Sequence, residues 1–244
     1  MNVTVSADYD ELSLAVAQHI ASFIEKHPGT LLCFAAGDTP LGALRKLVAL
    51  QAEHRIDLAS MYYVGLDEWV GLGYGDVGSC KQVMHDNFYG PANIPADHIS
   101  VFDGLNSDTG RQTTNAFAFI EKHGGIAFAM LGVGMNGHLG FNEPGTPPDF
   151  PGGIVALDET TRTVGKKYFN KSFRLDSGIT IGIKTLIAAR EILLIANGDK
   201  KAMIIHQALA EQPTVSVPAS LVQKHPGLHV FLDAGAAVLL RKNG

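Results

Sequence analysis

The sequence predicts a single α/β domain with a Rossmann-like, doubly wound and mostly parallel sheet that carries helices on both faces. Short apolar runs alternate along the chain with longer stretches of helical apolar spacing, which is typical of repeated strand–helix units. The short runs are continuously apolar, as expected of strands buried on both faces. With 244 residues, 46% hydrophobic and 18% charged, the chain can bury one large core. No repeat or linker divides residues 1–244, so one domain is expected over all of them.

Each element follows from the local pattern. Helical spacing predicts helices over residues 9–27, 40–54, 79–89, 108–123, 199–211 and 234–241. Buried strands are predicted for TLLCFAA (30–36), SMYYVGL (60–66), IAFAMLGV (126–133), ITIGI (179–183), EILLIAN (191–197) and HVFLD (229–233). The segment GFNEPGTPPDFPGG (140–153) is too rich in Gly and Pro for either, and a loop of this length usually has a function, often as a lid.

Composition excludes several classes of partner. The net charge of −5 argues against nucleic acid, which selects for basic faces. No apolar run approaches the roughly 18 residues that a membrane span needs. The N-terminal MNVTVSADYDELS lacks a basic region, so no signal peptide is expected. Cys33 and Cys80 offer neither a disulfide framework nor metal-ligand spacing. We therefore expect a cytoplasmic protein with no metal site, which binds a small molecule.

A glycine motif lies near the middle of the chain, in LGVGMNGHLGFNEPG (131–145). Its G-x-G-x-x-G spacing is that of a dinucleotide-binding turn, which requires a strand before it and a helix after it. The strand is present, but HLGFNEPGTPP has no helical periodicity, so the sequence predicts no dinucleotide cofactor. The glycines instead allow a tight turn at the carboxyl end of a strand, where Asn136 and His138 are presented. Ligands of open α/β sheets bind outside such strand ends.

The segment GDTPLG, after the first predicted strand, has the features of a phosphate site. Gly37 permits a turn and Thr39 is a natural N-cap, and a helix N-terminus attracts phosphate. An ordinary strand–helix turn remains the alternative. The charge of Asp38 opposes an anion, so its side chain is expected to point away, into its own backbone. Lys167 and Lys201 could complete the site, although either could be a solvated surface charge.

Acid–base candidates stand at two strand ends. Asp67 and Glu68 follow SMYYVGL, where a carboxylate either caps a helix or transfers protons. His138 titrates near neutral pH, which suits proton transfer, and Glu143 stands five residues further on. The alternative for His138 is a hydrogen-bonded structural residue.

Three motifs together resemble a known family. AAGDTPLG, GLDEWVGLG and GVGMNGHLGFNEPG, in this order and spacing, are similar to those of the glucosamine-6-phosphate/galactosamine-6-phosphate isomerase (deaminase) family. The resemblance spans nearly the whole chain. The related 6-phosphogluconolactonases share the fold and the Gly-His turn, but lack the F-N-E-P that this chain carries at 141–144.

The resemblance implies an activity and a role for each candidate residue. The activity is conversion of an amino-sugar 6-phosphate, of glucosamine or galactosamine type, to the ketose 6-phosphate and ammonia, without a cofactor. Asp67 is expected to move a proton between C2 and C1 of the open sugar. His138 is expected to assist ring opening, while Asn136 and Glu143 hold its imidazole. The phosphate-binding positions are Gly37, Asp38, Thr39, Lys167 and Lys201.

Three positions depart from the family pattern. Asn136 stands where many relatives have Asp, Ala36 where Thr or Ser is usual, and Lys167 where many have Arg. Two other functions stay open. A phosphosugar lactonase would need His138 as a base, but neither Asp67 nor Glu143. A non-catalytic sugar-phosphate sensor would need no acid–base set.

Regulation is expected to be simple. Larger members of the family form hexamers that an N-acetylated sugar phosphate activates through basic residues at subunit contacts. Residues 144–161 of this chain contain no Lys or Arg. We therefore expect a monomer or small homo-oligomer without such activation.

Overall fold

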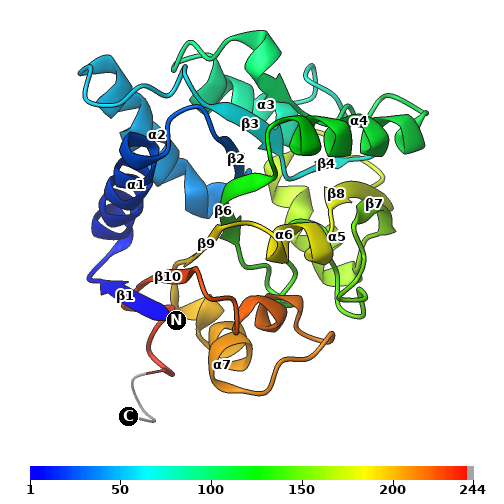
Figure 1. Ribbon diagram of the computed structural model, residues 1–244. Helices are drawn as coiled ribbons and strands as arrows, with labels where there is room; N and C mark the ends of the chain where they lie inside the picture. The colour runs from blue at the N-terminus through cyan, green and yellow to red at the C-terminus, as the bar shows by residue number, and fades with distance from the viewer. Residues whose placement is uncertain (241–244) are drawn as a thin grey trace.

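The computed structural model describes residues 1–240 (Figure 1). Its central sheet has seven parallel strands in the order β1-β10-β9-β6-β2-β3-β5, which confirms the predicted parallel α/β class. Their bounds are β1 (Asn2–Ser6), β2 (Leu31–Phe34), β3 (Tyr62–Gly65), β5 (Ile99–Ser100), β6 (Ile126–Gly132), β9 (Glu191–Ala196) and β10 (Leu228–Asp233). A second, antiparallel sheet of three strands has the order β4 (Asp67–Trp69), β8 (Ser177–Ile181), β7 (Gly152–Ala156).

Helices cover both faces of the central sheet, as the sequence predicts. One face packs against α1 (Tyr9–Lys26), α2 (Asp38–Ala52) and α3 (Cys80–Met84), the last continued by a π-helical turn over His85–Tyr89. The other face packs against α4 (Thr109–Lys122), α6 (Ile183–Ile187) and α7 (Ala202–Ala210), which a 3-10 turn over Asp199–Lys201 precedes. The short α5 (Glu159–Gly165) lies beside the small sheet, where Gly165 meets the ring of Trp69 (Figure 1).

Two predicted elements were wrong. The run ITIGI was expected in the central sheet, but β8 belongs to the antiparallel sheet. It resembles a central strand because Ile179 and Ile181 reach into the main core and Thr180 between them is also fully buried. The predicted helix 234–241 is a series of turns over 234–240, and residue 241 lies outside the described residues. The carboxylate of Asp233 accepts hydrogen bonds from the N–H groups of Gly198 and Ala236, which stabilises a turn there.

The strand order creates a crevice at one edge of the sheet. The chain proceeds from β2 outward to β3 and β5, then returns to β6 on the other side of β2. The connections that leave the carboxyl ends of β2 and β6 therefore diverge, which is where open α/β sheets bind ligands. The candidate residues collect at this edge.

Candidate active site

The turn between β2 and α2 presents an uncapped helix N-terminus. Gly37 is the N-cap, with φ at 143°, a conformation that favours glycine. Thr39 was expected to be the N-cap but lies in the first turn of α2, where its hydroxyl donates to the side-chain oxygen of Asn197. Among the described residues no side chain caps this end of α2, so its N–H groups remain available to an anion. The hydroxyl of Tyr9 binds the backbone of Asp38, Thr39 and Gly42 and so fixes the turn.

The sequence suggested that the side chain of Asp38 points into its own backbone. In the structure it points toward Lys167 instead. Its Oδ2 lies 2.6 Å from Nζ of Lys167, and both side chains are more than half exposed. Partial burial opposes the charge of Lys167, but the hydrogen bond to Asp38 and the charge interactions with Asp38 and Tyr168 together raise the pKa of Lys167. The carboxylate is therefore compensated, and Lys167 is held over the start of α2.

Lys201 lies in the connection that follows β9, and its side chain reaches the region near the start of α2. Its Nζ donates to the carbonyl oxygen of Val133, just beyond β6. Burial, together with repulsion from Lys167, lowers the pKa of Lys201 to about 8. The structure thus brings together both predicted lysines near the uncapped end of α2. Neither is an isolated surface charge.

Asp67 is the first residue of β4, immediately after β3. A small cavity lined by Ala36, Leu66, Asp67 and Cys80 adjoins its carboxylate. Burial raises the pKa of Asp67 to about 6, although a hydrogen bond from the Cys80 thiol and the nearby His138 oppose this shift. A carboxylate that is ionised at neutral pH, yet binds protons readily, has the properties of a general base.

Glu68 has a structural role. Its buried carboxylate accepts hydrogen bonds from the backbone N–H groups of Trp69, Cys80 and Lys81, at 2.7–2.9 Å. It thereby satisfies the first N–H groups of α3. The two adjacent carboxylates therefore differ in position and in function. Glu68 caps α3, whereas Asp67 faces the candidate active site.

The imidazole of His138 is held at one nitrogen and over one face. Nδ1 lies 2.9 Å from Oγ1 of Thr161 and 3.4 Å from Oε2 of Glu143. Because a carboxylate can only accept, Nδ1 carries the hydrogen, which leaves the lone pair of Nε2 for a reactant. A Cβ atom at Gly134 would lie 2.5 Å from three atoms of the imidazole, so a glycine at this position leaves room for the ring of His138.

Asn136 and Glu143 lie together, as the sequence predicts. Nδ2 of Asn136 donates to Oε2 of Glu143 at 2.9 Å and to Oδ1 of Asp158 at 3.2 Å. Burial alone would raise the pKa of Glu143, but hydrogen bonds from His138, Thr161 and Asn136 lower it below its usual value. Glu143 is therefore an anion beside the imidazole.

The loop after the glycine motif is firmly anchored. Asn142 is fully buried and binds the carbonyl oxygens of Leu139 and Ile181 and the N–H of Ile183. These contacts fix the backbone immediately before Glu143. This part of the expected lid is therefore anchored to the core beside His138.

Four residues of the site were not predicted. Thr161 and Asp158 reach it from α5, Cys80 from α3 and Asn197 from the end of β9. Asp158 had a local signal, since D-E-T-T opens a helix and Asp158 caps it. Thr161 and Asn197 had none, because their partners are distant in the sequence.

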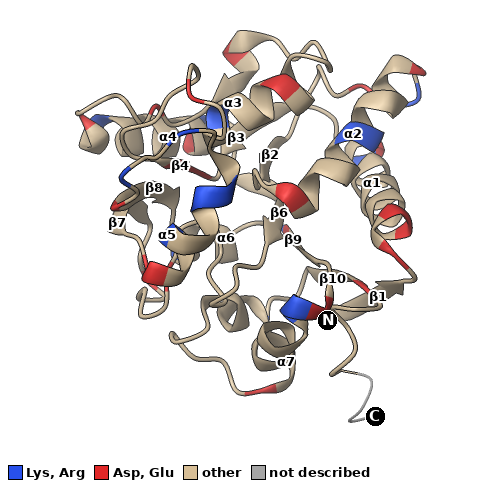
Figure 2. Cartoon of the chain, turned by 180° about the vertical axis from the view of Figure 1, so that it is seen from behind, with Lys and Arg blue, Asp and Glu red and all other residues tan. Residues whose placement is uncertain are grey.

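Charges of both signs are interspersed over the described chain in the view of Figure 2, instead of gathering by sign. Figure 2 therefore shows no extended basic face over the described residues. Within residues 1–240, no helix has the length and apolar character that crossing a membrane demands.

Known proteins resemble this chain over nearly its whole length. The family of glucosamine-6-phosphate isomerases and 6-phosphogluconolactonases matches residues 6–231. A glucosamine-6-phosphate deaminase of Lachnoclostridium phytofermentans is 37% identical over 95% of this chain and 98% of its own length. That of Thermoanaerobacter pseudethanolicus is 32% identical over 98% and 95%.

Solved structures have the same fold. A monomeric glucosamine-6-phosphate deaminase superposes with a TM-score of 0.93 at 30% identity, covering 98% of this chain and all (100%) of its own. The 6-phosphogluconolactonase of Trypanosoma brucei superposes with a TM-score of 0.79, covering 98% of each chain. At 18% identity, the latter shows the fold alone.

Proposed function

Because this chain belongs to the family of glucosamine-6-phosphate isomerases and 6-phosphogluconolactonases, we propose that it is an amino-sugar-6-phosphate deaminase. The observation that carries the proposal is the pairing of Asp67, a base with a pKa of about 6, with the buried Glu143–His138 pair. A lactonase needs one base, whereas aldose–ketose conversion needs a base at carbon and an acid–base group at the ring oxygen. Both groups lie at the edge where α2 offers its N–H groups.

The phosphate binds at the start of α2. The N–H groups after Gly37 and the ammonium groups of Lys167 and Lys201 surround it. Asp38 holds Lys167 in place before the ligand enters. Thr39 fixes this turn to Asn197.

Ring opening is the task of His138. Its free Nε2 transfers the proton between the C1 hydroxyl and the ring oxygen, while Glu143 and Thr161 hold Nδ1. Asn136 orients Glu143 without adding the negative charge that an Asp would bring.

Isomerisation is the task of Asp67. Its carboxylate takes the proton from C2 of the open sugar, and the protonated acid returns it to C1. This transfer leaves the nitrogen double-bonded to C2 as an imine, water adds to C2, ammonia leaves from the same carbon, and the product is the ketose 6-phosphate. Every proton that Asp67 removes is returned, so the cycle needs no redox cofactor.

Assembly and location follow the relatives. We propose a single domain over residues 1–244, because β8 shares its apolar core with the central sheet. The chain acts as a monomer or small homo-oligomer in the cytoplasm, in keeping with its similarity to a deaminase described as monomeric.

An ammonia-release assay tests the activity. Purified protein is offered glucosamine 6-phosphate, galactosamine 6-phosphate and 6-phosphogluconolactone in parallel, with hydrolysis of the lactone followed by acid release. We expect ammonia and ketose 6-phosphate in equal amounts from one or both amino sugars. Acid release from the lactone without ammonia would identify a lactonase. Tight binding without turnover of any of the three would identify a sensor.

A further inference from the structure

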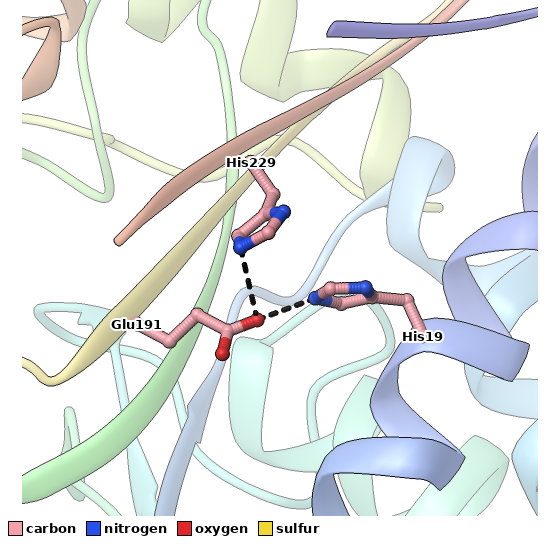
Figure 3. A group of neighbouring side chains, drawn as sticks. All are labelled: His19, Glu191 and His229. Carbon is pink, nitrogen blue, oxygen red and sulfur yellow. Dashed lines mark hydrogen bonds and ion pairs between the residues drawn. The ribbon is translucent and has the colours of Figure 1, made fainter. Parts of the chain in front are cut away.

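A cluster of three side chains lies at the edge of the sheet opposite the candidate active site. His19 projects from α1, Glu191 is the first residue of β9, and His229 is the second residue of β10 (Figure 3). The active-site residues lie beyond the carboxyl ends of the strands, whereas Glu191 and His229 lie at the amino ends.

The strand register brings Glu191 and His229 onto one face. His229 pairs with Leu193, and Leu193 and Glu191 point to the same side because they are two residues apart. This face packs against α1, so His19 is directed at both. In Figure 3 the two imidazoles converge on one carboxylate oxygen.

The ligand atoms are already close. Nε2 of His229 lies 3.6 Å from Oε1 of Glu191, and Nε2 of His19 contacts the same oxygen directly. One ligand atom from each residue lies within 4.8 Å of the others. Ligands around a tetrahedral Zn²⁺ are about 3.3 Å apart, given bonds of about 2.0–2.1 Å. A small outward rotation of His19 therefore makes room for an ion.

The surroundings fix the ring positions. His19 packs against the rings of Phe128 and Phe231, with centroids 6.0 and 5.3 Å away, and against His229 at 4.5 Å. The three side chains are between 20 and 26% exposed, so water can supply a fourth ligand.

We propose that His19, Glu191 and His229 form a Zn²⁺ site that fastens α1 to the amino edge of the central sheet. Two imidazoles and one carboxylate suit Zn²⁺, while Ca²⁺ and Mg²⁺ prefer oxygen ligands alone. No other group of His, Cys, Asp and Glu within residues 1–240 comes together in this way. The role is structural: the ion joins residues 172 positions apart in the sequence, and it is independent of the proposed deaminase activity.

Zinc titration by calorimetry tests this site. Protein stripped with a chelator and then desalted is titrated with ZnCl₂ at pH 7.5, and CoCl₂ serves as a spectroscopic probe of coordination. We expect one Zn²⁺ per chain and a visible Co²⁺ spectrum of four-coordinate type. His19→Gln and His229→Gln should each weaken Zn²⁺ binding at least about 100-fold, since each removes a direct ligand. Zn²⁺ should raise the Tm of the wild type but not of these variants.

The control is His85→Gln, which should bind Zn²⁺ like the wild type. His85 also lies near a carboxylate, 3.3 Å from Asp86, but the pair has no third ligand. Equal Zn²⁺ affinity in the wild type and both cluster variants would overturn the proposal, as would no binding by the wild type at about 100 μM Zn²⁺. If His19→Gln does not fold, His229→Gln, in a side chain that is 26% exposed near the strand end, decides the matter alone.

Discussion

Asp67 combines accessibility to the site with a carboxyl group that burial makes more basic. Asp67→Asn keeps the shape but cannot accept a proton. We expect kcat to fall by about 10²–10⁴-fold, the usual contribution of a general base, while KM for the sugar phosphate changes little. Steady-state kinetics with the active amino sugar check this. A KM that rises in parallel with the loss of kcat would show that Asp67 binds substrate or supports the fold.

The same carboxyl group predicts two opposite effects of pH. The base must be ionised, so kcat/KM should fall as pH drops through about 6.

Stability changes the other way, because a folded-state pKa above the unfolded value means that the native state binds the extra proton between pH 4 and 6. Ionised Asp67 thus costs the fold about 3 kcal/mol at neutral pH, because its pKa rises from 3.8 to about 6 and each pKa unit is worth about 1.4 kcal/mol. Asp67→Asn should raise Tm at pH 7.5 and lose this advantage near pH 4, as thermal unfolding at both pH values will show.

Lys201 gives an alkaline limit to phosphate binding. Its pKa of about 8 means that the free enzyme loses this charge as pH rises above that value, so KM should increase there. Lys201→Ala should raise KM by about 10–100-fold at pH 7, if its charged hydrogen bond is worth about 1.5–3 kcal/mol, and should abolish the alkaline rise. The matched control is Lys200→Ala, an exposed neighbour. A KM of Lys201→Ala equal to that of the control would remove Lys201 from the phosphate site.

Thr161 positions His138 without reaching the substrate side of the ring. Thr161→Val removes the hydroxyl that lies 2.9 Å from Nδ1 and should lower kcat about 10-fold with little change in KM. Thr161→Ser, which keeps the hydroxyl, should retain the rate, whereas a purely packing role would favour Val, which keeps the shape of Thr, over Ser. Thr163→Val, exposed on the same helix, is the control. Wild-type kcat in Thr161→Val would mean that Glu143 alone fixes the imidazole.

At the level of elements, the glycine motif lets the imidazole of His138 pack against the backbone that follows β6. The chain turns sharply at the end of β6 and folds the imidazole of His138 back over Gly134. Gly134→Ala would place a methyl group 2.5 Å from the ring and displace it, and a displacement of about 1 Å can cost about 10²-fold in rate. Activity should therefore fall while the circular dichroism spectrum stays the same. Gly110→Ala, in α4 with open surroundings, should have full activity. Full activity in Gly134→Ala as well would contradict the observed contact.

The strand–helix alternation predicted most of the central sheet because continuous apolar runs are unambiguous there. The small sheet was not predicted. Its strand β4 has only three residues and β7 begins at two glycines, so neither shows a periodic pattern. The acid–base pair was predicted from Asp67 and His138 at strand ends. The partners on α5 were not, since no local pattern records that Thr161 will meet His138 across 23 positions. The cluster of His19, Glu191 and His229 was not predicted either, because its members are also distant in the sequence.

At the scale of the whole molecule, the surface of residues 1–240 offers little for a large assembly. Large exposed apolar residues lie on separate elements, such as Leu14 on α1, Leu105 between β5 and α4, and Met203 on α7. Stable oligomers usually bury about 1,200–2,000 Å² with an apolar centre, and single scattered residues do not supply one. The segment that follows the catalytic loop, residues 144–161, also has no Lys or Arg to bind a second phosphate.

We therefore expect a monomer or small homo-oligomer with hyperbolic kinetics that N-acetylglucosamine 6-phosphate does not activate. Activation of that kind needs an effector phosphate held by basic side chains, and an effector can shift a rate only through different affinities for two states. The phosphate site that we propose, formed by the start of α2, Lys167 and Lys201, lies at the proposed catalytic edge itself, so the effector should act as a weak competitor there. Sedimentation velocity and rate-versus-substrate curves, with and without the effector, check both points. A hexamer with sigmoidal curves that become hyperbolic on adding the effector would contradict them.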